Sequence, residues 1–422
     1  MKKIFISVSL LLLMLFLASC GKKGRAENEF LFATWAAGTE LREFNDVIRR
    51  VNEKADGEYT VSVQSIPADY YIKLSSMISA NNAPDFFWLT QELISKYADL
   101  GAALDITSWF EDSDVLVPDD FFPGVLNSAT YQGKYWGLPW IANPIMIYLN
   151  EDLFNLAGVE LPSATADWTW EEFIDICREF KGMKTADGKD IYGCIVDGWP
   201  NIETFIWSGG GDILADDGTV LIDSEESLRG LANLHTIITE GLTPKYSEVG
   251  SLGSNNVWFE KGRVAMFMGG VQDNFEYKQT FVSEEERFPI KYAPMPKAPD
   301  GGQWAFDWTA STIVSPKVKN KDLAYKALEA LTLEFFTWKL APPIIGGEEK
   351  IKEIAPLKED AYETIVYTLQ FARSANYLPE WSKINDKLWY DLYLLMLQNK
   401  PNFNYETETR KIANYTRNLL KE

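Results

Sequence analysis

Residues 29–66, EFLFATWAAGTELREFNDVIRRVNEKADGEYTVSVQSI, decide the fold class of this chain. The apolar run 29–35 predicts a β-strand, and residues 59–66 alternate as a second strand with valines on one face. Between them, residues 40–54 predict a helix, because their apolar side chains recur at helical spacing: Leu41, Phe44, Val47, Ile48 and Val51. A strand, a helix and a strand in succession are typical of a parallel sheet with crossover helices, so we expect an α/β fold.

Further elements are predicted along the chain. Residues 84–89 form an apolar run that indicates another buried strand. Three apolar helices are each preceded by a residue that can cap the first turn. The capping residues are Thr169 with Glu172 three residues on, Asp223 with Glu226 at the same spacing, and Asn320.

Length and charge limit the kind of protein this can be. The chain has 422 residues, more than the ~250 to 300 at which one hydrophobic core stops growing, so we expect two lobes. It carries 40 basic and 61 acidic side chains, a formal net charge of −21. That balance repels nucleic acid and anionic lipid, so nucleic acid is not an expected partner.

Residues 1–28 predict an export signal and a tether. Lys2 and Lys3 precede an apolar stretch, residues 4–17, that is shorter than the ~20 residues of a membrane-spanning helix. The ending Leu17-Ala-Ser-Cys20 resembles a bacterial lipoprotein signal. The resemblance implies removal of residues 1–19, acylation of Cys20 with palmitate or a similar chain, and a tether over residues 20–28 that holds the protein outside the cytoplasm. The alternative is an ordinary secreted protein in which Cys20 is incidental.

The remaining cysteines and the single histidine argue against most catalytic and metal chemistry. An extracytoplasmic compartment permits a bridge between Cys177 and Cys194, but Cys177 lies among apolar residues and we favour a buried core residue. His235, on a partly apolar predicted helix, is interpreted as a packed or surface residue. Zinc sites and serine or cysteine hydrolases usually need histidine, and no oxygen-rich loop has metal-ligand spacing. We therefore expect no metal, no cofactor and no enzyme.

A series of short motifs runs in order along the chain. It comprises Tyr131-Gln-Gly-Lys-Tyr-Trp-Gly-Leu-Pro139, Met146-Ile-Tyr-Leu-Asn150, Asp152-Leu-Phe154, Ala157-Gly158, Leu161-Pro162, Thr169-Trp170, Glu172-Phe173, Gly209-Gly-Gly211, Asp217-Gly218, Phe259-Glu-Lys-Gly262, Ala265-Met266, Ala293-Pro294 with Pro296, and residues 315–324. In this order the motifs resemble extracellular solute-binding proteins of the first family, the oligosaccharide receptors of ABC importers. The resemblance covers nearly all of the chain after the tether.

The resemblance implies a two-lobed periplasmic-binding-protein fold of type II, in which three crossings join two lobes and each lobe is a mixed sheet flanked by helices. We expect lobe 1 to comprise residues 29–140 and 268–335, and lobe 2 to comprise residues 141–267 and 336–422. Three crossings between two lobes create a cleft that closes by hinge motion.

Each crossing has a local marker. The first follows a hairpin-like turn at Gln132-Gly133 and begins near Pro139. A strand that ends in Gly269-Gly270 marks the second, because glycines permit backbone angles that other residues resist. A third lies between Leu331 and Pro343, where Pro342-Pro343 ends a helix.

Tryptophans are the expected stacking surfaces of a sugar site. The chain has 15, and many follow strands or lie in loops. Sugar rings pack their C–H faces on indole rings, while their hydroxyls need polar partners at the rim. The candidate platforms are Trp35, Trp88, Trp140, Trp199, Trp207, Trp304 and Trp308.

The expected polar partners are mostly acidic, because carboxylates accept strong hydrogen bonds from hydroxyl groups. They are Asp85, Asp197, Gln272, Asp273, Asp307 and Arg373. The sequence departs from the family pattern after Gly269-Gly270, where Val271-Gln-Asp273 stands in place of a common tryptophan. A hydrogen-bonding pair can replace a stacking surface there, which leaves the identity of the ligand open.

The resemblance implies a monomeric, lipid-anchored receptor that binds a carbohydrate in the cleft and delivers it to the membrane subunits of an ABC permease. Two alternatives stay open. The same fold can bind a polyamine or a peptide, or present its ligand to a sensor. A carbohydrate hydrolase using two carboxylates is a remote alternative, since the chain has no local catalytic signature.

Overall fold

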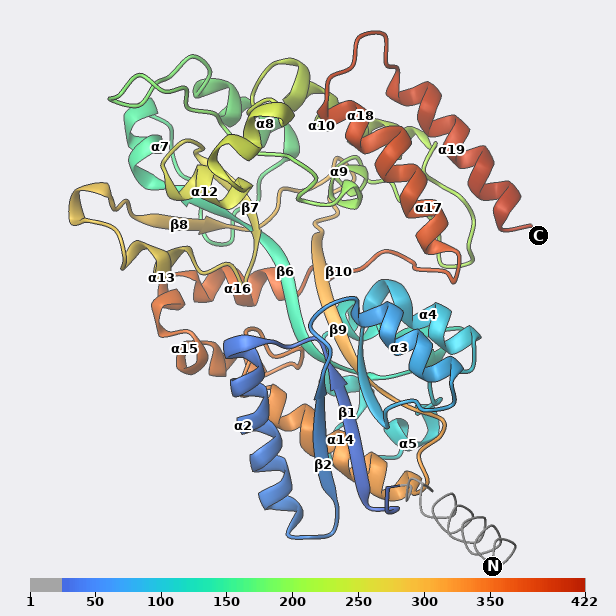
Figure 1. Cartoon of the computed structure of the whole chain (residues 1–422). Coiled ribbons are helices and arrows are strands. Elements are labelled where there is room, and N and C mark those ends of the chain that lie inside the picture. Colours follow the sequence, from blue (N-terminus) through green and yellow to red (C-terminus); the bar gives the residue numbers. More distant parts are fainter. Residues whose placement is uncertain (1–24, 422) are drawn as a thin grey trace, which may run out of the picture.

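The computed structural model describes residues 25–421 and consists of two lobes joined by long strands (Figure 1). Two of these strands pass from one lobe to the other: β6 (Leu138–Asn150) and β9 (Ala305–Val314). They pair antiparallel, with Ala142 opposite Thr309. The expectation of two lobes of mixed α/β structure is confirmed.

The lower lobe is built on the strand–helix–strand unit that opens the described chain. Strands β1 (Glu29–Thr34) and β2 (Thr60–Ser65) run parallel, and helix α2 (Gly38–Ala55) connects them. Strand β3 (Phe86–Thr90) is parallel to β1 and antiparallel to β9, which makes the sheet mixed. Helices α2 and α14 (Lys321–Phe335) cover one face of this sheet (Figure 1). The predicted parallel unit is confirmed.

Smaller elements complete the lower lobe and its border with the hinge. They are α3 (Tyr70–Ser79), α4 (Gln91–Asp99), α5 (Thr107–Glu111), η1 (Pro118–Asp120), α6 (Pro123–Asn127), β4 (Thr130–Tyr131) and β5 (Lys134–Tyr135). The predicted turn at Gln132-Gly133 joins β4 to β5, and both of its residues have positive φ, 53° and 68°. Glycine meets that requirement without strain.

The upper lobe continues the sheet from the second half of β6. Strands β7 (Met266–Gly270) and β8 (Ile290–Ala293) both pair antiparallel with β6. The helices around them are α7 (Glu151–Ala157), α8 (Trp170–Glu179), α9 (Ile202–Ser208), α10 (Glu225–Thr239), α11 (Tyr246–Val249), η2 (Gly250–Leu252), α12 (Asn255–Glu260), α13 (Phe275–Gln279) and η3 (Glu284–Glu286).

The chain after α14 returns from the lower lobe to the upper one. After α14 the backbone of Ala341 exchanges two hydrogen bonds of 3.0 Å with Ala142 of β6. The remaining elements are η4 (Gly347–Lys350), α15 (Ile351–Ile354), η5 (Pro356–Ala361), α16 (Tyr362–Leu369), β10 (Ala372–Arg373), α17 (Trp381–Lys387), η6 (Leu388–Tyr393), α18 (Leu394–Leu397) and α19 (Tyr405–Leu419). Helices α17, α18 and α19 pack on the upper lobe (Figure 1).

Strand pairing differs from the expected division of the chain at the second crossing. Residues 268–293 include the end of β7 and all of β8, which pair with β6 in the upper lobe. The chain returns to the lower lobe through β9, about 35 residues later than expected. A division that follows the pairing places residues 268–304 with lobe 2.

Two of the three predicted helix caps are confirmed. Thr169 accepts a hydrogen bond from the backbone N–H of Glu172, whose carboxylate accepts one from the N–H of Thr169. Asn320 caps α14 through the N–H of Leu323.

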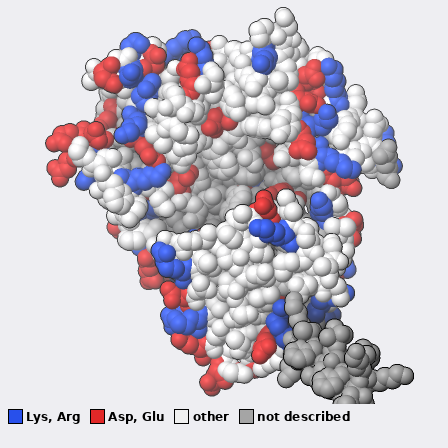
Figure 2. Space-filling view, viewed as in Figure 1, with Lys and Arg blue, Asp and Glu red and all other residues white. Residues whose placement is uncertain are grey.

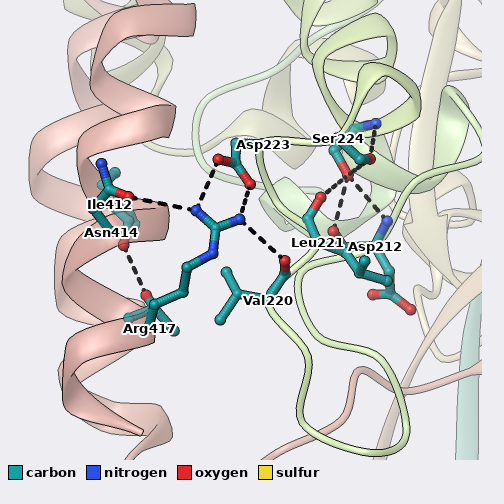
Figure 3. Close-up of polar contacts among 10 residues, drawn as sticks. Asp212, Val220, Leu221, Asp223, Ser224, Ile412, Asn414 and Arg417 are labelled. Atoms are coloured by element: carbon teal, nitrogen blue, oxygen red, sulfur yellow. Dashed lines mark hydrogen bonds and ion pairs between the residues drawn. The ribbon is translucent and has the colours of Figure 1, made fainter. Parts of the chain in front are cut away.

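The third predicted cap is wrong by one residue. Ser224, not Asp223, caps α10 and accepts a hydrogen bond of 3.1 Å from the N–H of Ser227 (Figure 3). Asp223 instead receives two hydrogen bonds from Arg417 of α19, at 2.5 and 3.0 Å (Figure 3). A tertiary ion pair therefore engages the carboxylate that the local spacing assigned to the helix.

Gly269 and Gly270 lie where a larger side chain would not fit, and not where the backbone needs a left-handed conformation. Neither has positive φ. A Cβ atom on Gly270 would lie 2.4 Å from Oδ1 of Asn143, and one on Gly269 would lie 2.5 Å from Oδ2 of Asp273. The two glycines therefore let neighbouring polar side chains approach the backbone of β7 closely.

The cysteines, the histidine and the helices also test expectations made from the sequence. Cys177 and Cys194 are buried, unbridged members of the upper-lobe core, which confirms the interpretation of Cys177 as a core residue. His235 is exposed and packs its ring 5.1 Å from that of Tyr405. Among the helices of residues 25–421, none is both long and apolar enough to cross a membrane. Cys20 and the signal lie outside the described residues.

Candidate functional site

The surface is hollowed between the two lobes (Figure 2). Strands β1 and β3 are parallel, so the residues that follow them reach the same edge of the lower-lobe sheet. Trp35 follows β1 and Gln91 follows β3. Crossing strand β9 carries Asp307 and Trp308 past this edge, so the topology gathers these four residues beside the hinge.

Asp307 is the centre of a buried polar network in the hinge. It is 0% exposed, and its Oδ1 accepts a hydrogen bond of 2.7 Å from the N–H of Asn143 on β6. The side chain of Gln91 donates to the carbonyl of Asp307 at 3.0 Å and accepts from the N–H of Thr309 at 3.0 Å. Burial raises the pKa of Asp307 well above its usual range. Asp307 thus joins the lower lobe to both crossing strands.

Trp308 and Trp35 form the aromatic part of the hinge. Trp308 is half-buried and packs against the apolar cores of both lobes. Its ring lies 6.5 Å from that of Trp35, which also packs edge-on against Tyr70 at 5.4 Å and Tyr71 at 6.4 Å. Both tryptophans are half-buried, so each keeps part of its ring surface open to solvent.

A layered stack forms the aromatic part of the upper lobe. The guanidinium of Arg373 lies 4.8 Å from the ring of Trp207 and 4.7 Å from that of Trp304. Asp212 pairs with Arg373 and accepts a hydrogen bond of 3.1 Å from Nε1 of Trp207. Trp207 is 1% exposed, whereas Trp304 is 38% exposed and presents an open ring face. Cation–π contacts and the ion pair hold the stack in place.

The other predicted residues of the upper lobe lie near its strand β7. Trp199 donates from Nε1 to the carbonyl of Met268 at 2.8 Å, and Asp197 accepts a hydrogen bond from Asn255 at 3.0 Å. The backbone N–H of Gln272 donates a hydrogen bond of 3.0 Å to Oδ1 of Asn143, and Asp273 follows Gln272 in the chain. Burial raises the pKa of Asp197 and of Asp273.

A buried lysine fixes the segment that carries Gln272 and Asp273. Lys358, 1% exposed, pairs with Glu276 at 2.9 Å and donates to the carbonyl of Asp273. It also donates to the hydroxyl of Tyr148 at 3.1 Å, and that hydroxyl donates to the carbonyl of Gly270 at 2.8 Å. The C-terminal return of the chain is thereby tied to the turn after β7.

Besides the buried Asp307 and Trp207, three more predicted residues do not face the cleft. Trp88 and Trp140 stack on each other at 4.5 Å inside the lower-lobe core and are 0% and 2% exposed. They lie within strands whose side chains are buried, so neither ring is open to a ligand. Asp85 precedes β3 at the end remote from the hinge, where it accepts from the N–H of Leu31 at 2.8 Å and pairs with Arg25 at 2.9 Å.

One buried acidic residue of the upper lobe was missed from the sequence. Glu203 begins α9, is 4% exposed, and lines a cavity of about 150 Å³ together with Asn201, Gly198, Asn385, Trp389 and Tyr393. Burial raises its pKa to about 7. No local motif marks Glu203, since its burial depends on α17 and η6, almost 200 residues later in the chain.

The described residues include few groups that suit covalent or metal chemistry. Across residues 25–421, no group of three or more His, Cys, Asp or Glu side chains is placed to hold a metal ion. Aromatic faces, carboxylates, amides and one guanidinium surround the cleft. This set of groups suits reversible binding of a polar, ring-containing ligand.

Comparison with known proteins agrees with this geometry. The family profile described as bacterial extracellular solute-binding protein matches residues 36–334. The chain belongs to this family. A binding protein of Brucella abortus (strain 2308) is 26% identical over 354 residues, which cover 80% of this chain and 81% of the relative. The diacetylchitobiose binding protein DasA of Streptomyces coelicolor is 24% identical over 68% of this chain and 63% of its own length.

Solved structures show the fold of this solute-binding protein independently. The ABC substrate-binding protein of Listeria monocytogenes in complex with cycloalternan superposes with a TM-score of 0.73 at 21% sequence identity. The match covers 93% of this chain and 99% of the Listeria chain. A likeness at this identity shows the fold, which is the two-lobed fold of solute receptors.

Proposed function

We infer that this solute-binding protein is an extracytoplasmic receptor that binds a carbohydrate in the cleft between its lobes. The observation that carries the inference is a set of partly open aromatic rings: Trp35 and Trp308 lie beside each other at the hinge, and Trp304 stacks on Arg373. Indole rings stack on the C–H faces of sugars, while the partly exposed Asp197, Gln272 and Arg373 supply hydrogen-bonding partners. The names of two relatives, a diacetylchitobiose binding protein and a maltodextrin-binding protein, support a glycan ligand.

The receptor delivers its ligand to the membrane subunits of an ABC importer. Closure is a population shift, in which the glycan binds the closed arrangement more tightly and the permease distinguishes closed from open. Acylation of Cys20 tethers the mature chain to the membrane that holds the permease. The receptor acts as a monomer and catalyses no reaction on the glycan.

One alternative has support from a specific observation. Carboxylates outnumber cations around the cleft, and Arg373 is already paired with Asp212. A polyamine would satisfy such carboxylates and also pack against the aromatic rings. The neutral stacking surfaces favour the carbohydrate, and polyamines and peptides therefore serve as comparison ligands.

A thermal-shift screen of the protein lacking residues 1–20 tests the proposal. The panel contains neutral, acetylated and amino oligosaccharides, with spermidine and short peptides alongside. A ligand that binds only the native state stabilises it by about 2.7 kcal/mol at a hundredfold excess over its Kd. A saturable shift with glycans of one family supports the carbohydrate receptor. Shifts with spermidine or peptides alone would refute it.

Two variants make the screen specific to the cleft. Trp304→Ala removes the open ring of the stack and is expected to weaken glycan binding at least tenfold, since aromatic faces dominate such contacts. Tyr277→Ala is the matched control, because Tyr277 is 55% exposed on α13, on the outer surface. Equal loss in both variants would contradict the placement of the ligand. Palmitate labelling of the full chain, with Cys20→Ser as control, tests the anchor.

A further inference from the structure

The carboxylate of Glu203 is buried without a counter-ion. Its side chain is 96% buried and borders the 150 Å³ cavity between α9 and η6, the Glu203 cavity. Among residues 25–421, no Lys, Arg or His side chain forms an ion pair with the carboxylate. No Lys, Arg or His lines the cavity. A buried carboxylate in this position either holds a proton or needs a cation from elsewhere.

The charges nearest to Glu203 are also negative. After burial and its own N–H, the nearby carboxylates of Asp212 and Glu92 affect its pKa most, and both raise it. Asp212 is neutralised by Arg373, so that cation is already engaged. Glu92 accepts a hydrogen bond of 2.6 Å from Thr90 but has no cationic partner among the described residues. The site therefore has more negative charge than its own cations balance.

Aromatic rings form two walls of the cavity. The rings of Trp389 and Tyr393 lie 5.7 Å apart at 87°. Gly198 lets the edge of the Trp389 ring approach the backbone, because a Cβ there would lie 2.7 Å from the ring. The hydroxyl of Tyr393 donates to the carbonyl of Pro200 at 2.6 Å, so Glu203 is the acidic group of a lining whose other free polar side chains are the amides Asn201 and Asn385.

The volume limits what can enter. A water molecule occupies about 30 Å³ in the liquid, so the cavity holds roughly five waters or one edge of a sugar ring. A whole disaccharide does not fit. The Glu203 cavity is thus suited to one substituent of a larger ligand that lies in the cleft.

We propose that the Glu203 cavity binds a protonated primary amine carried by the glycan, as in an amino sugar whose amine is not acetylated. The inference rests on the proposed function, because the amine arrives as part of the carbohydrate. An ammonium group brings the missing positive charge and three N–H donors. Its hydrogen bond to a carboxylate is about twice as strong as a neutral one, and the Trp389 ring adds a cation–π contact.

Matched glycans isolate the effect of the amine. A β-1,4-linked glucosamine trimer, its N-acetylated form and cellotriose differ only in the substituent at C2, which is an ammonium, an acetamide or a hydroxyl. Isothermal titration at pH 7.0 gives the affinity of each, with maltotriose and spermidine as further ligands. The proposal expects the glucosamine trimer to bind at least tenfold more tightly than the acetylated and neutral trimers.

Two variants connect that preference to the cavity. Glu203→Gln removes the charge at constant shape and is expected to abolish the tenfold preference for the amine. Glu179→Gln makes the same chemical change at an exposed position of α8 and is expected to keep it. A Glu203→Gln protein that retains the preference overturns the proposal. Circular dichroism of each variant establishes that it is folded.

The outcomes separate this inference from the function on which it rests. Tighter binding of an acetylated or neutral glycan, maltotriose included, overturns the amine site and leaves the carbohydrate receptor standing. Binding of spermidine with no glycan binding refutes the carbohydrate receptor and the glycan-borne amine together. If no glycan in the panel binds, the carbohydrate receptor and the glycan-borne amine are likewise both refuted.

Discussion

Glu203→Gln is expected to stabilise the protein at alkaline pH and to leave it unchanged at acidic pH. The pKa of Glu203 is about 7 in the folded chain, against 4.5 for an ordinary glutamate. The folded state therefore holds the proton more tightly than the unfolded state. The stabilisation that this bound proton gives to the folded state is complete below pH 4.5 and is lost as the pH rises to about 7. The difference corresponds to about 3 kcal/mol, without discount for exposure because the side chain is 96% buried.

Urea unfolding at pH 4.5 and pH 8.5 measures this effect. Glutamine matches the shape of the protonated carboxyl, so wild type and Glu203→Gln should agree at pH 4.5. At pH 8.5 the variant should be more stable by about 3 kcal/mol. Glu179→Gln, the exposed control, should match wild type at both values. Equal stability of wild type and Glu203→Gln at pH 8.5 would refute the argument, because it would show that the ionised carboxylate is not desolvated.

Four further substitutions and one control test the packing that positions the site. Ser224→Ala should cost about 1 kcal/mol in urea unfolding, because it removes the cap of α10, and Asp223→Ala should cost less, since its partner Arg417 is partly exposed. A larger loss of stability in Asp223→Ala than in Ser224→Ala would indicate that Asp223 caps α10. Lys358→Met should destabilise by about 3 to 5 kcal/mol, because it leaves Glu276 buried without its partner, and a loss below 1 kcal/mol would contradict the ion pair. Gly270→Ala should cost about 1 to 3 kcal/mol, because its Cβ displaces Asn143, whereas Gly250→Ala, with open space around it, should be near neutral in the same assay.

The fold was predictable wherever neighbouring residues decide the structure. The period of two in residues 59–66 and the helical period in residues 40–54 became β2 and α2 with parallel pairing of the flanking strands. The cap at Thr169 depends on residues three apart and was also confirmed. Asp223 has the same spacing but lies next to Arg417, 194 residues later, so tertiary packing overrode the local signal.

Whether a predicted tryptophan of the lower-lobe sheet reaches the hinge depends on where it lies relative to the end of its strand. Trp35 comes directly after β1 and reaches the hinge, whereas Trp88 lies within β3 and is buried in the lower-lobe core. A tryptophan inside an apolar run is therefore better interpreted as core. Glu203 follows an ordinary loop, and nothing near it in sequence indicates that Trp389 and Tyr393 enclose it.

Ligand charge also bears on how the lobes close. Glu92 belongs to the lower lobe and Glu203 to the upper one. Burial above all raises the pKa of Tyr377, and both carboxylates raise it further, so the two lie near the same hydroxyl. Like charges on opposite lobes oppose their approach when the cleft is empty. A neutral sugar leaves that repulsion in place, whereas an ammonium between the carboxylates converts it into attraction from both sides. An amine on the glycan would therefore favour the closed arrangement through the same two residues that make the empty site unfavourable.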